Sequence, residues 1–340
     1  MNLKLLKNSL KNEPAYRFKQ CQQVIWHDLI DDWQKAFNLP QKLRVELNQK
    51  IPLELEAKII RSDDKKTIKA LITLIDDKKI ETVLMRHNDG RNTVCVSSQV
   101  GCPLGCLFCS TGQVGYKRNL EIDEIITQVL FFARLLKKEN KKVTNVVFMG
   151  MGEPFLNYDN VIEAIKILNN KDYFNIGARH ISISTIGLPE DIYKLSKENL
   201  QINLAISLHA PNNKLRDKLI PLNKKYSLNQ VLTVVKDYIK ETNRRVMIEY
   251  IMLKDFNDSE QAANQLVELL KYLPSKLYLL NLILYNKGDF LNNKFQPSSP
   301  KNVALFKHIL GRNKINVTER HRFGKEIDAA CGQLANKYNH

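Results

Sequence analysis

The chain has 340 residues, 44% of them hydrophobic, which excludes a disordered protein and allows one large domain or two smaller ones. Its net charge of +16 favours a polyanionic partner such as nucleic acid, although a lysine-rich proteome would produce the same surplus. The first 19 residues lack the apolar core of a signal peptide, and the most apolar run, Leu277–Tyr285, is too short to cross a bilayer. The sequence therefore predicts a cytoplasmic protein without membrane contact, whose cysteines stay reduced and serve metals or catalysis.

Two segments of different character precede the cysteine-rich stretch. Residues 1–50 have a helical pattern, which predicts an N-terminal helical domain. The apolar face expected for it consists of Tyr16, Phe18, Val24, Ile25, Trp26, Leu29 and Trp33. In residues 51–98, apolar residues alternate from Ile68 to Leu74, and Asp76-Asp77 marks a turn before further short apolar runs. This second segment is predicted to form a small antiparallel meander.

From Cys102 onward, helical patterns alternate with short apolar runs. The helical patterns cover residues 122–138, 158–168, 188–198, 227–241, 258–272 and 300–311. The apolar runs are Val146–Met149, His180–Ser184, Ile202–Ser207, Val246–Ile251 and Leu277–Leu284. Such alternation predicts an α/β fold whose parallel βα units close fully or partly into a barrel over residues 99–318, followed by a tail at residues 319–340.

Polar motifs follow four of the expected strands. They are Gly150–Pro154 (GMGEP), Ser184–Gly187 (STIG), Ser207–Asn212 (SLHAPN) and Tyr285–Gly288 (YNKG). In parallel barrels the chemistry lies at the carboxyl ends of the strands, so we expect the active site where these motifs meet.

Half of the six cysteines fall within one stretch, GCPLGCLFCSTG, at Gly101–Gly112. The CxxxCxxC spacing lets Cys102, Cys106 and Cys109 converge on one face of a short loop. A structural zinc site would need a fourth ligand and usually has a second paired knuckle, but the chain has no second CxxC. A [4Fe-4S] cluster held by only three cysteines leaves one iron open to chelate a small molecule, and Phe108 would shield one side of it.

A cysteine loop placed between a strand and the first helix of a barrel resembles the radical S-adenosylmethionine (SAM) superfamily. The resemblance implies a partial (β/α)6 barrel, a [4Fe-4S] cluster, and SAM bound to the open iron through its amino and carboxylate groups. Gly152 and Glu153 in GMGEP resemble the superfamily's GGEP motif, which meets the SAM amino group. The other SAM contacts expected at strand ends are Ser184, Ser207, Leu208, His209 and Asn286.

Two of the three remaining cysteines point to one family within that superfamily. Cys21 is interpreted as a half-buried structural thiol of the N-terminal segment, whereas Cys95 ends the meander and Cys331 lies in IDAACGQLA near the C-terminus. With TVCVSSQVGCPLGCLFCSTG, NVVFMGMGEP and LAISLHAPNNKLRD, this pattern resembles the RlmN-type dual-specificity RNA methyltransferases over nearly the whole chain. The pair Cys95 and Cys331 separates that family from other radical SAM enzymes.

The resemblance implies a mechanism that uses two SAM molecules per turnover. A first SAM methylates Cys331, and a second, bound to the cluster, yields a 5′-deoxyadenosyl radical that removes hydrogen from this methyl group. The resulting methylene radical adds to carbon 2 of an adenosine, the adduct loses an electron, and Cys95 forms a disulfide with Cys331 as the methylated base leaves. Glu81 matches the family's proton acceptor, with a solvated strand carboxylate as the alternative interpretation.

The resemblance also implies the partners. The substrates are an adenosine in the peptidyl-transferase centre of 23S rRNA and the adenosine at position 37 of tRNA, with flavodoxin or ferredoxin as the expected type of electron donor. We expect a monomer whose residues 1–50 contact RNA. The candidate basic contacts are Lys11, Arg17, Lys19, Lys117, Arg118, Lys224, Lys225, Arg312, Lys314, Arg320, Arg322 and Lys325.

Two alternatives stay open. The Cfr type methylates carbon 8 of the same rRNA adenosine with the same cluster and the same two thiols. The SLHAPN motif favours the RlmN type, whereas Arg322-Phe323-Gly324 and the loop KGDFLNNKFQPSSP depart from its pattern. A noncatalytic iron–sulfur or zinc RNA-binding protein would need the basic surface but neither Cys95 nor Cys331.

Overall fold

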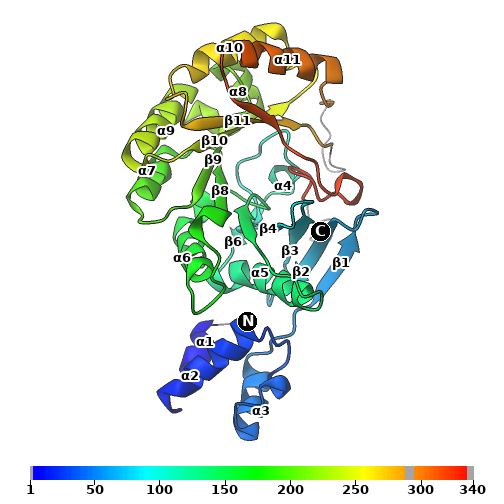
Figure 1. Cartoon of the computed structure of the whole chain (residues 1–340), viewed down its shortest axis with the longest axis vertical. Helices are drawn as coiled ribbons and strands as arrows, with labels where there is room; N and C mark the ends of the chain where they lie inside the picture. Colours follow the sequence, from blue (N-terminus) through cyan, green and yellow to red (C-terminus); the bar gives the residue numbers. More distant parts are fainter. Residues whose placement is uncertain (1–2, 288–294, 335–340) are drawn as a thin grey trace.

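A ten-stranded sheet forms the centre of the molecule (Figure 1), seen in a computed structural model that describes residues 3–287 and 295–334. Its first four strands pair antiparallel in chain order. They are β1 (Ala57–Arg61), β2 (Thr67–Thr73), β3 (Lys79–Arg86) and β4 (Asn92–Val96). The predicted meander is therefore present, and it gains β1, which the sequence pattern did not reveal.

The remaining strands are parallel and begin at β4 itself, which pairs with β7. They are β7 (Asn145–Phe148), β8 (Ile181–Thr185), β9 (Asn203–Ser207), β10 (Val246–Met252), β11 (Tyr278–Leu284) and β12 (Val317–Glu319). The connecting helices are α5 (Ile122–Lys137), α6 (Tyr158–Asn169), α7 (Pro189–Lys197), α8 (Asn213–Leu219), α9 (Leu228–Thr242), α10 (Glu260–Leu270) and α11 (Pro300–Arg312). The predicted α/β fold of strand–helix units is confirmed, and the sheet runs unbroken across the boundary predicted at residues 98 and 99.

Local sequence signals explain where several helices begin and end. Ser227 and Gln230 form a capping box at the start of α9, and Asn243 ends that helix in the left-handed region at φ 50°. Ser299 caps α11, whose first residue is Pro300, a residue that lacks the N–H that would otherwise go unbonded there. None of the helices within residues 3–287 and 295–334 is long and apolar enough to cross a membrane.

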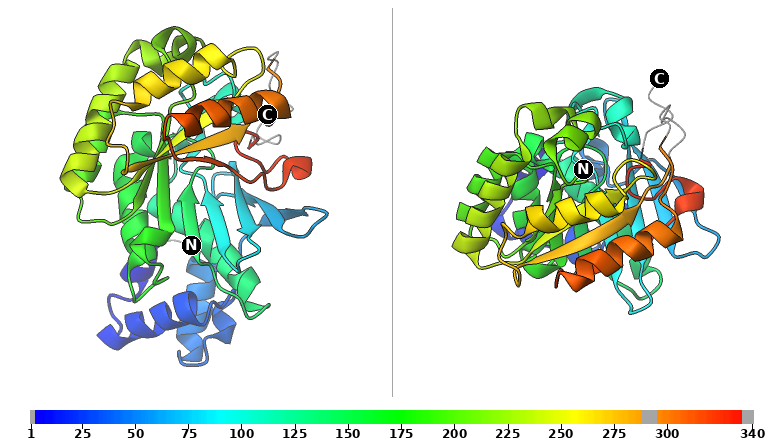
Figure 2. Two further views of the ribbon diagram at one scale, coloured as in Figure 1. Left: turned by 45° about the horizontal axis from the view of Figure 1, so that its top comes forward. Right: turned by 90° about the horizontal axis from the view of Figure 1, so that it is seen from above.

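The two faces of the parallel sheet differ in accessibility. The helices form an arc around the outside of the strands (Figure 2), and the outward-facing residues of β8, Ile181 and Ile183, are fully buried beneath them. The alternating residues Ser182 and Ser184 point the other way and line a cavity of about 820 Å³. Because strand side chains alternate between faces, the inner face of the sheet stays available for chemistry.

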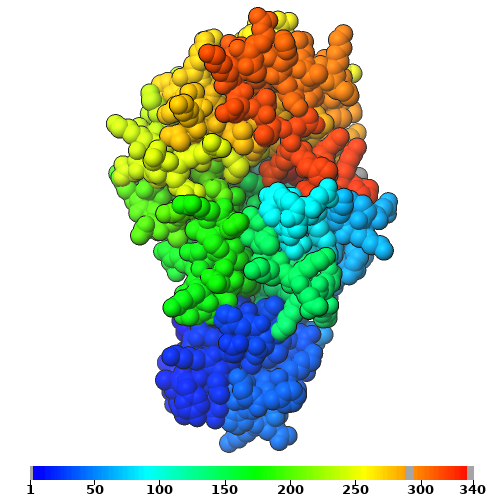
Figure 3. Space-filling model, viewed as in Figure 1, coloured from blue at the N-terminus to red at the C-terminus, as the bar shows by residue number. Residues whose placement is uncertain are grey.

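The N-terminal residues form a separate helical block at one end of the molecule (Figure 3). Its elements are α1 (Leu3–Ser9), α2 (Ala15–Gln22), a π-helical turn (Gln23–His27), a 3₁₀ turn (Trp33–Lys35) and α3 (Gln41–Lys50). Trp33 is fully buried and donates its indole N–H to the carbonyl of Ile51 at 2.7 Å. Trp26 packs on the Tyr173 and Phe174 rings, with centroids 5.4 and 5.0 Å away, and so joins the block to the rest of the chain.

Two expectations for this block were wrong. Tyr16 does not belong to the apolar face, because it is 53% exposed with the Arg17 guanidinium 4.9 Å from its ring centre. Cys21 is fully buried rather than half-buried, and burial raises the pKa of its thiol to about 12. Both residues belong to the regular helix α2, where positions five apart point to nearly opposite sides, so the face that buries Cys21 leaves Tyr16 in solvent.

Candidate active site

Five of the six cysteines line the cavity on the inner face of the sheet. Cys95 lies on β4, Cys102, Cys106 and Cys109 come from the loop that follows it, and Cys331 comes from the C-terminal tail. The sixth, Cys21, belongs to the N-terminal block. Thiols from three separate segments of the chain thus meet in one cavity.

The CxxxCxxC loop is held in a narrow hairpin between β5 (Gln99–Gly101) and β6 (Tyr116–Asn119). Gly101 has φ +79°, and a Cβ there would lie 1.8 Å from the carbonyl oxygen of Gly115, so no other residue fits. Cys102 donates its backbone N–H to that same carbonyl at 3.0 Å. The glycines therefore bring the two sides of the hairpin together and fix where the cysteines begin.

The three thiols of this loop fit a cluster by the chemistry of the donor set. Burial raises the pKa of Cys102 to about 12, so thiolates require a positive charge such as iron to persist there. Within residues 3–287 and 295–334, no group of three or more His, Cys, Asp or Glu side chains is arranged to hold one metal ion. A [4Fe-4S] cluster does not need its three cysteines around a single metal ion, because each thiolate binds a different iron atom. Phe108, predicted to shield the cluster, is buried and stacks edge-on against His209 at 4.7 Å.

Hydrogen bonds join the Cys331 loop directly to the CxxxCxxC loop. Ser110, which starts the short helix α4 (Ser110–Gln113), donates its backbone N–H to the carbonyl of Gly332 at 2.8 Å. Thr111 donates its hydroxyl to the carbonyl of Leu334, a residue 223 positions away in the sequence. Cys331 is consequently held beside the cysteine loop, and its exposed surface faces the cavity.

A buried ion pair holds the other side of the same tail. Lys69 and Glu81 lie 3.2 Å apart (Nζ to Oε1), and both side chains are buried. Lys69 also donates to the carbonyl of Asp328 at 3.1 Å, three residues before Cys331. The interpretation of Glu81 as a solvated strand carboxylate was wrong. Glu81 does not line the cavity, and the structure gives it a role in holding Lys69 and, through it, the tail.

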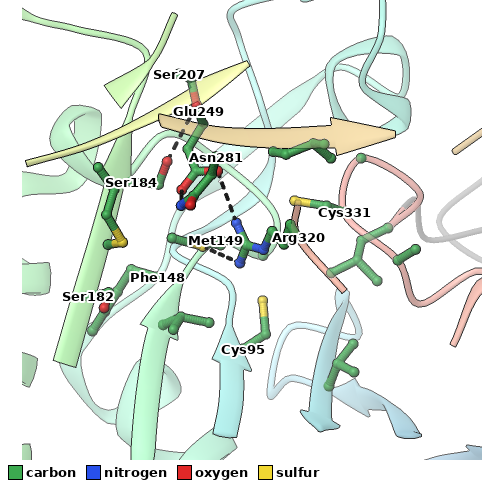
Figure 4. A pocket seen from close by; sticks show the side chains of 18 of the residues that line it. Cys95, Phe148, Met149, Ser182, Ser184, Ser207, Glu249, Asn281, Arg320 and Cys331 are labelled. Carbon is green, nitrogen blue, oxygen red and sulfur yellow. Dashed lines mark hydrogen bonds and ion pairs between the residues drawn. The ribbon is translucent and has the colours of Figure 1, made fainter. Parts of the chain in front are cut away.

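Arg320 lies between Cys95 and Cys331 in the cavity (Figure 4). Its guanidinium is 2.9 Å from the sulfur of Met149 and 3.5 Å from a carboxylate oxygen of Glu249. Burial raises the pKa of both Cys95 and Cys331, while the Arg320 charge opposes that rise by favouring the thiolates. Arg320, a candidate RNA contact of the tail, lines the cavity between these two thiols.

Sequence reasoning missed Glu249, which fixes this guanidinium. Glu249 is 2% exposed and accepts a hydrogen bond from Asn281 at 2.9 Å on the neighbouring strand. Thr318 in turn donates its hydroxyl to Asn281, which links three adjacent strands. A signal was available, since Glu249 is the single charge in the apolar strand VMIEYIM, and a buried charge needs a partner or a function.

The predicted SAM residues mostly come together at the carboxyl ends of the strands. Gly152 has φ +98°, and a Cβ there would lie 2.6 Å from the Gln99 side chain. The Glu153 carboxylate accepts backbone N–H groups from Phe155 at 3.0 Å and Ile186 at 2.9 Å. Burial raises the pKa of Glu153 to about 7, a shift that a bound ammonium group would reverse.

Of the other predicted SAM contacts, four line the cavity and one does not. Ser184 and Ser207 place their hydroxyl oxygens 3.4 Å apart across β8 and β9. Asn286 is buried in the wall, and its side-chain oxygen has no hydrogen-bond partner in the described part of the chain, as expected of a group that awaits a ligand. His209 lines the cavity as well, whereas Leu208 is buried behind it.

His209 and the unpredicted Arg216 fix the backbone around these contacts. His209 accepts the N–H of Ile251 at its Nδ1, 3.2 Å away, and burial lowers its pKa to about 3, so the ring stays neutral. Arg216 is 1% exposed and donates to the carbonyls of Leu208 at 3.0 Å and Ile186 at 2.6 Å. Nothing in the sequence pattern separated Arg216 from the surface arginines.

Most basic residues predicted to contact RNA are exposed, but Arg17 and Arg118 already have carboxylate partners, Glu13 lying 3.9 Å from Arg17. Arg118 forms ion pairs with Asp76 at 2.9 Å and with Glu124 at 2.7 Å, which makes it a structural cation. The exposed ones are Lys11, Lys19, Lys117, Lys224, Lys225, Arg312, Lys314, Arg322 and Lys325. Half of the loop KGDFLNNKFQPSSP, whose departure bore on the Cfr alternative, lies outside the described residues.

Comparisons with known proteins agree with this geometry. Residues 96–267 match the Radical SAM superfamily. The chain is 46% identical over 326 residues to the probable dual-specificity RNA methyltransferase RlmN of Dictyoglomus turgidum, covering 96% of this chain and 92% of that protein. It is 44% identical to the ribosomal RNA large subunit methyltransferase N of Nitrosopumilus maritimus over 94% of this chain and 92% of that protein. A crystal structure of a radical SAM methyltransferase from Sphaerobacter thermophilus superposes with a TM-score of 0.92 at 40% identity, covering 98% and 97% of the two chains.

Removal of the buried guanidinium should destabilise the cavity wall. Arg216→Met leaves the carbonyls of Leu208 and Ile186 without donors, and we expect it to lower the free energy of unfolding by roughly 3 to 5 kcal/mol. Urea unfolding measures the change, with the exposed Arg245→Met as the matched control. Equal stability of the two variants would contradict the structural role of Arg216.

The neutral, buried His209 should make the protein sensitive to acid. Its folded-state pKa of about 3 lies below the value of about 6.5 for an unfolded histidine, so the unfolded state binds more protons between these pH values. Stability from this residue is therefore complete above pH 6.5 and decreases as the pH falls toward 3, by roughly 3 to 5 kcal/mol in total. Urea unfolding of cluster-free protein from pH 7 to pH 4 should show a shallower loss for His209→Gln, and an unchanged loss for the exposed His308→Gln.

Proposed function

The chain belongs to the radical SAM superfamily and to its RlmN-type RNA methyltransferases, and from that membership we propose that it methylates carbon 2 of adenosine. The proposed substrates are an adenosine in the peptidyl-transferase centre of 23S rRNA and the adenosine at position 37 of tRNA. One observation carries the proposal: Cys95 and Cys331 line the same cavity as the three cysteines of the CxxxCxxC loop. A binding protein without catalysis would need neither thiol.

A thiol is required because carbon 2 of adenine is electrophilic. Direct transfer from the electrophilic methyl group of SAM therefore fails at that carbon, and the methyl must first be carried by a nucleophile. Cys331 serves as that carrier: its sulfur accepts the methyl group of a first SAM, the thiol proton passes to solvent, and S-adenosylhomocysteine leaves. The Arg320 guanidinium supports this step, because its charge favours the thiolate form of Cys331.

The other residues of the cavity have distinct tasks. Cys102, Cys106 and Cys109 would hold the cluster, while Gly152 and Glu153, with the further cavity-lining contacts, would hold SAM. Bound together, the cluster and a second SAM supply the one-electron chemistry that activates the methyl group on sulfur. The activated carbon would add to carbon 2 of the adenine, and the adduct would give up one electron and the carbon-2 proton. Cys95 then attacks the Cys331 sulfur, so that a disulfide forms while the carbon–sulfur bond breaks with its electron pair on the carbon, which takes up a proton to complete the methyl group. An external reductant returns both thiols to the reduced form.

Carbon 8 of adenosine is the second candidate target. Arg322-Phe323-Gly324 departs from the RlmN-type pattern in the direction of the Cfr type, whereas SLHAPN follows the RlmN type. We also propose a cytoplasmic location and a flavodoxin or ferredoxin as electron donor, because the cluster and both thiols require a reducing compartment.

The methylated position is tested directly by the product. Cluster-reconstituted protein, incubated anaerobically with SAM, reductant and a fragment of 23S rRNA, should yield 2-methyladenosine in nucleoside mass spectrometry. An 8-methyladenosine product would move the protein to the Cfr type. A preparation that cleaves SAM but methylates neither this fragment nor a tRNA anticodon stem-loop would contradict the proposed acceptor.

The two thiols should fail in different ways when they are replaced. Cys331→Ala loses the methyl carrier, so turnover should fall below detection while RNA binding stays within about twofold. Cys95→Ala retains the carrier but lacks the thiol that releases the base, so a covalent protein–RNA adduct that survives denaturant should accumulate on gels. Cys21→Ala, at the buried thiol of the N-terminal block, is the control and should methylate normally. Methylation by Cys331→Ala would refute the carrier role.

A further inference from the structure

The cavity extends well beyond the cysteines, to the opposite ends of the strands. Arg91 precedes β4 and Arg179 precedes β8, so both line the cavity at the amino ends of the parallel strands. Arg322, three residues after β12, lines the cavity too. All three arginines are exposed. The mechanism described above uses none of them.

Three aromatic rings line the same part of the cavity. Phe323 lies between two imidazoles, with ring centres 4.9 Å from His87 and 4.6 Å from His321, both edge to face. His87 directly follows β3, and a 3.0 Å hydrogen bond between its Nε2 and the hydroxyl of Thr93 on β4 fixes its ring. His321 is exposed and Phe323 is half-buried, so the stack presents ring surface to the cavity.

The position of Phe323 is set by the glycine that follows it. Gly324 has φ +58°, and a Cβ there would lie 2.6 Å from the Thr67 methyl group and 2.9 Å from Ala329. The tail therefore packs tightly on β2 at this point. Because the same tail continues to Cys331, the aromatic stack and the proposed methyl carrier keep a fixed relation across one cavity.

We infer that these residues, here called the arginine–aromatic rim (Arg91, Arg179, Arg322, His87, His321 and Phe323), bind an unpaired nucleotide next to the target adenosine. The aromatic stack takes the neighbouring base, and the arginines take the flanking phosphates. This inference rests on the proposed function, since it assigns the substrate RNA to a second part of the same cavity.

Charge and surface chemistry favour RNA as the occupant of the rim. The Arg179 guanidinium donates to the neutral side-chain amide of Gln201 at 3.1 Å, and within the described residues Arg322 has no carboxylate partner. Arg91 alone is paired, with Asp89 at 2.8 Å. Guanidinium groups beside accessible aromatic rings are typical of surfaces that bind single-stranded RNA, because phosphates pair with the cations and bases stack on the rings.

The location also fits what the chemistry requires. SAM and the cluster would occupy the carboxyl ends of the strands, where Cys102 and Glu153 lie. An adenosine that reaches Cys331 must leave its own stack, so its neighbours lose a stacking partner at the same moment. A ring platform on the cavity wall replaces the stacking that the neighbouring base has lost.

A double-mutant cycle between protein and RNA tests the inference. Cluster-loaded protein is titrated anaerobically with a fluorescent RNA stem-loop that carries the target adenosine, and each flanking nucleotide is made abasic in turn. For the wild type, one abasic position should weaken binding by roughly 5- to 100-fold. For Phe323→Leu the intact RNA should bind correspondingly more weakly, and that abasic penalty should disappear, whereas Phe323→Trp should retain it.

Two controls separate stacking from a general loss of structure. Tyr193→Leu removes an exposed aromatic ring that also has a lysine beside it, Lys197 at 5.4 Å, but lies on α7 away from the cavity, so the abasic penalty should remain. Arg322→Gln should reduce the slope of log Kd against log salt concentration by about 0.7 while the penalty persists. A 2-aminopurine at the sensitive position should be quenched on binding by the wild type and not by Phe323→Leu.

The outcomes distinguish the inference from the proposed function. If the protein binds and methylates the RNA, but every flanking base is coupled to Phe323 by less than twofold, the rim does not stack a neighbouring base and the inference is wrong. If the wild type neither binds nor methylates the RNA, the proposed function fails first. A quench that persists in Phe323→Leu would also overturn the inference.

Discussion

The site depends on the hydrogen bonds that fasten the C-terminal tail to the cysteine loop. Ser110 and Thr111 directly follow Cys109, and they donate to the carbonyls of Gly332 and Leu334, one and three residues after Cys331. Backbone carbonyls accept these bonds, so the tail is positioned almost independently of its side chains. Without this connection, a thiol near the end of the chain would have no fixed relation to a cluster held more than 200 residues earlier.

The inner face of the parallel strands remains open because the crossover helices all pack against the outer face. The connections between parallel strands place every crossover helix on one side, and their apolar faces bury the outward residues. Inward positions therefore carry serines, an asparagine and a glutamate that would be unfavourable in a dry core. The antiparallel strands extend this surface, and they place Cys95 and His87 in the same cavity wall as residues of the parallel strands.

Buried charges give the cavity its rigidity. Arg216 donates to the carbonyls at the ends of β8 and β9, and Glu249 fixes Arg320 between Cys95 and Cys331. The Lys69–Glu81 pair does the same for the tail. Burying each of the two ion pairs costs free energy of desolvation. Removing one partner costs more, because it leaves the other charge buried without a counter-charge. Such networks favour one arrangement of the loops, which is what chemistry at a sulfur atom demands.

The sequence by itself determined the elements and the cofactor chemistry. Period-2 and period-3.6 patterns located the parallel strands and their helices, and the spacing of Cys102, Cys106 and Cys109 indicated a cluster, because these signals are local along the chain. Tertiary structure alone decided that Arg320 lies between Cys95 and Cys331, that Glu81 pairs with Lys69, and that β1 exists. Those facts depend on which side chains meet after distant segments pack, and no local pattern encodes the partner of a buried charge.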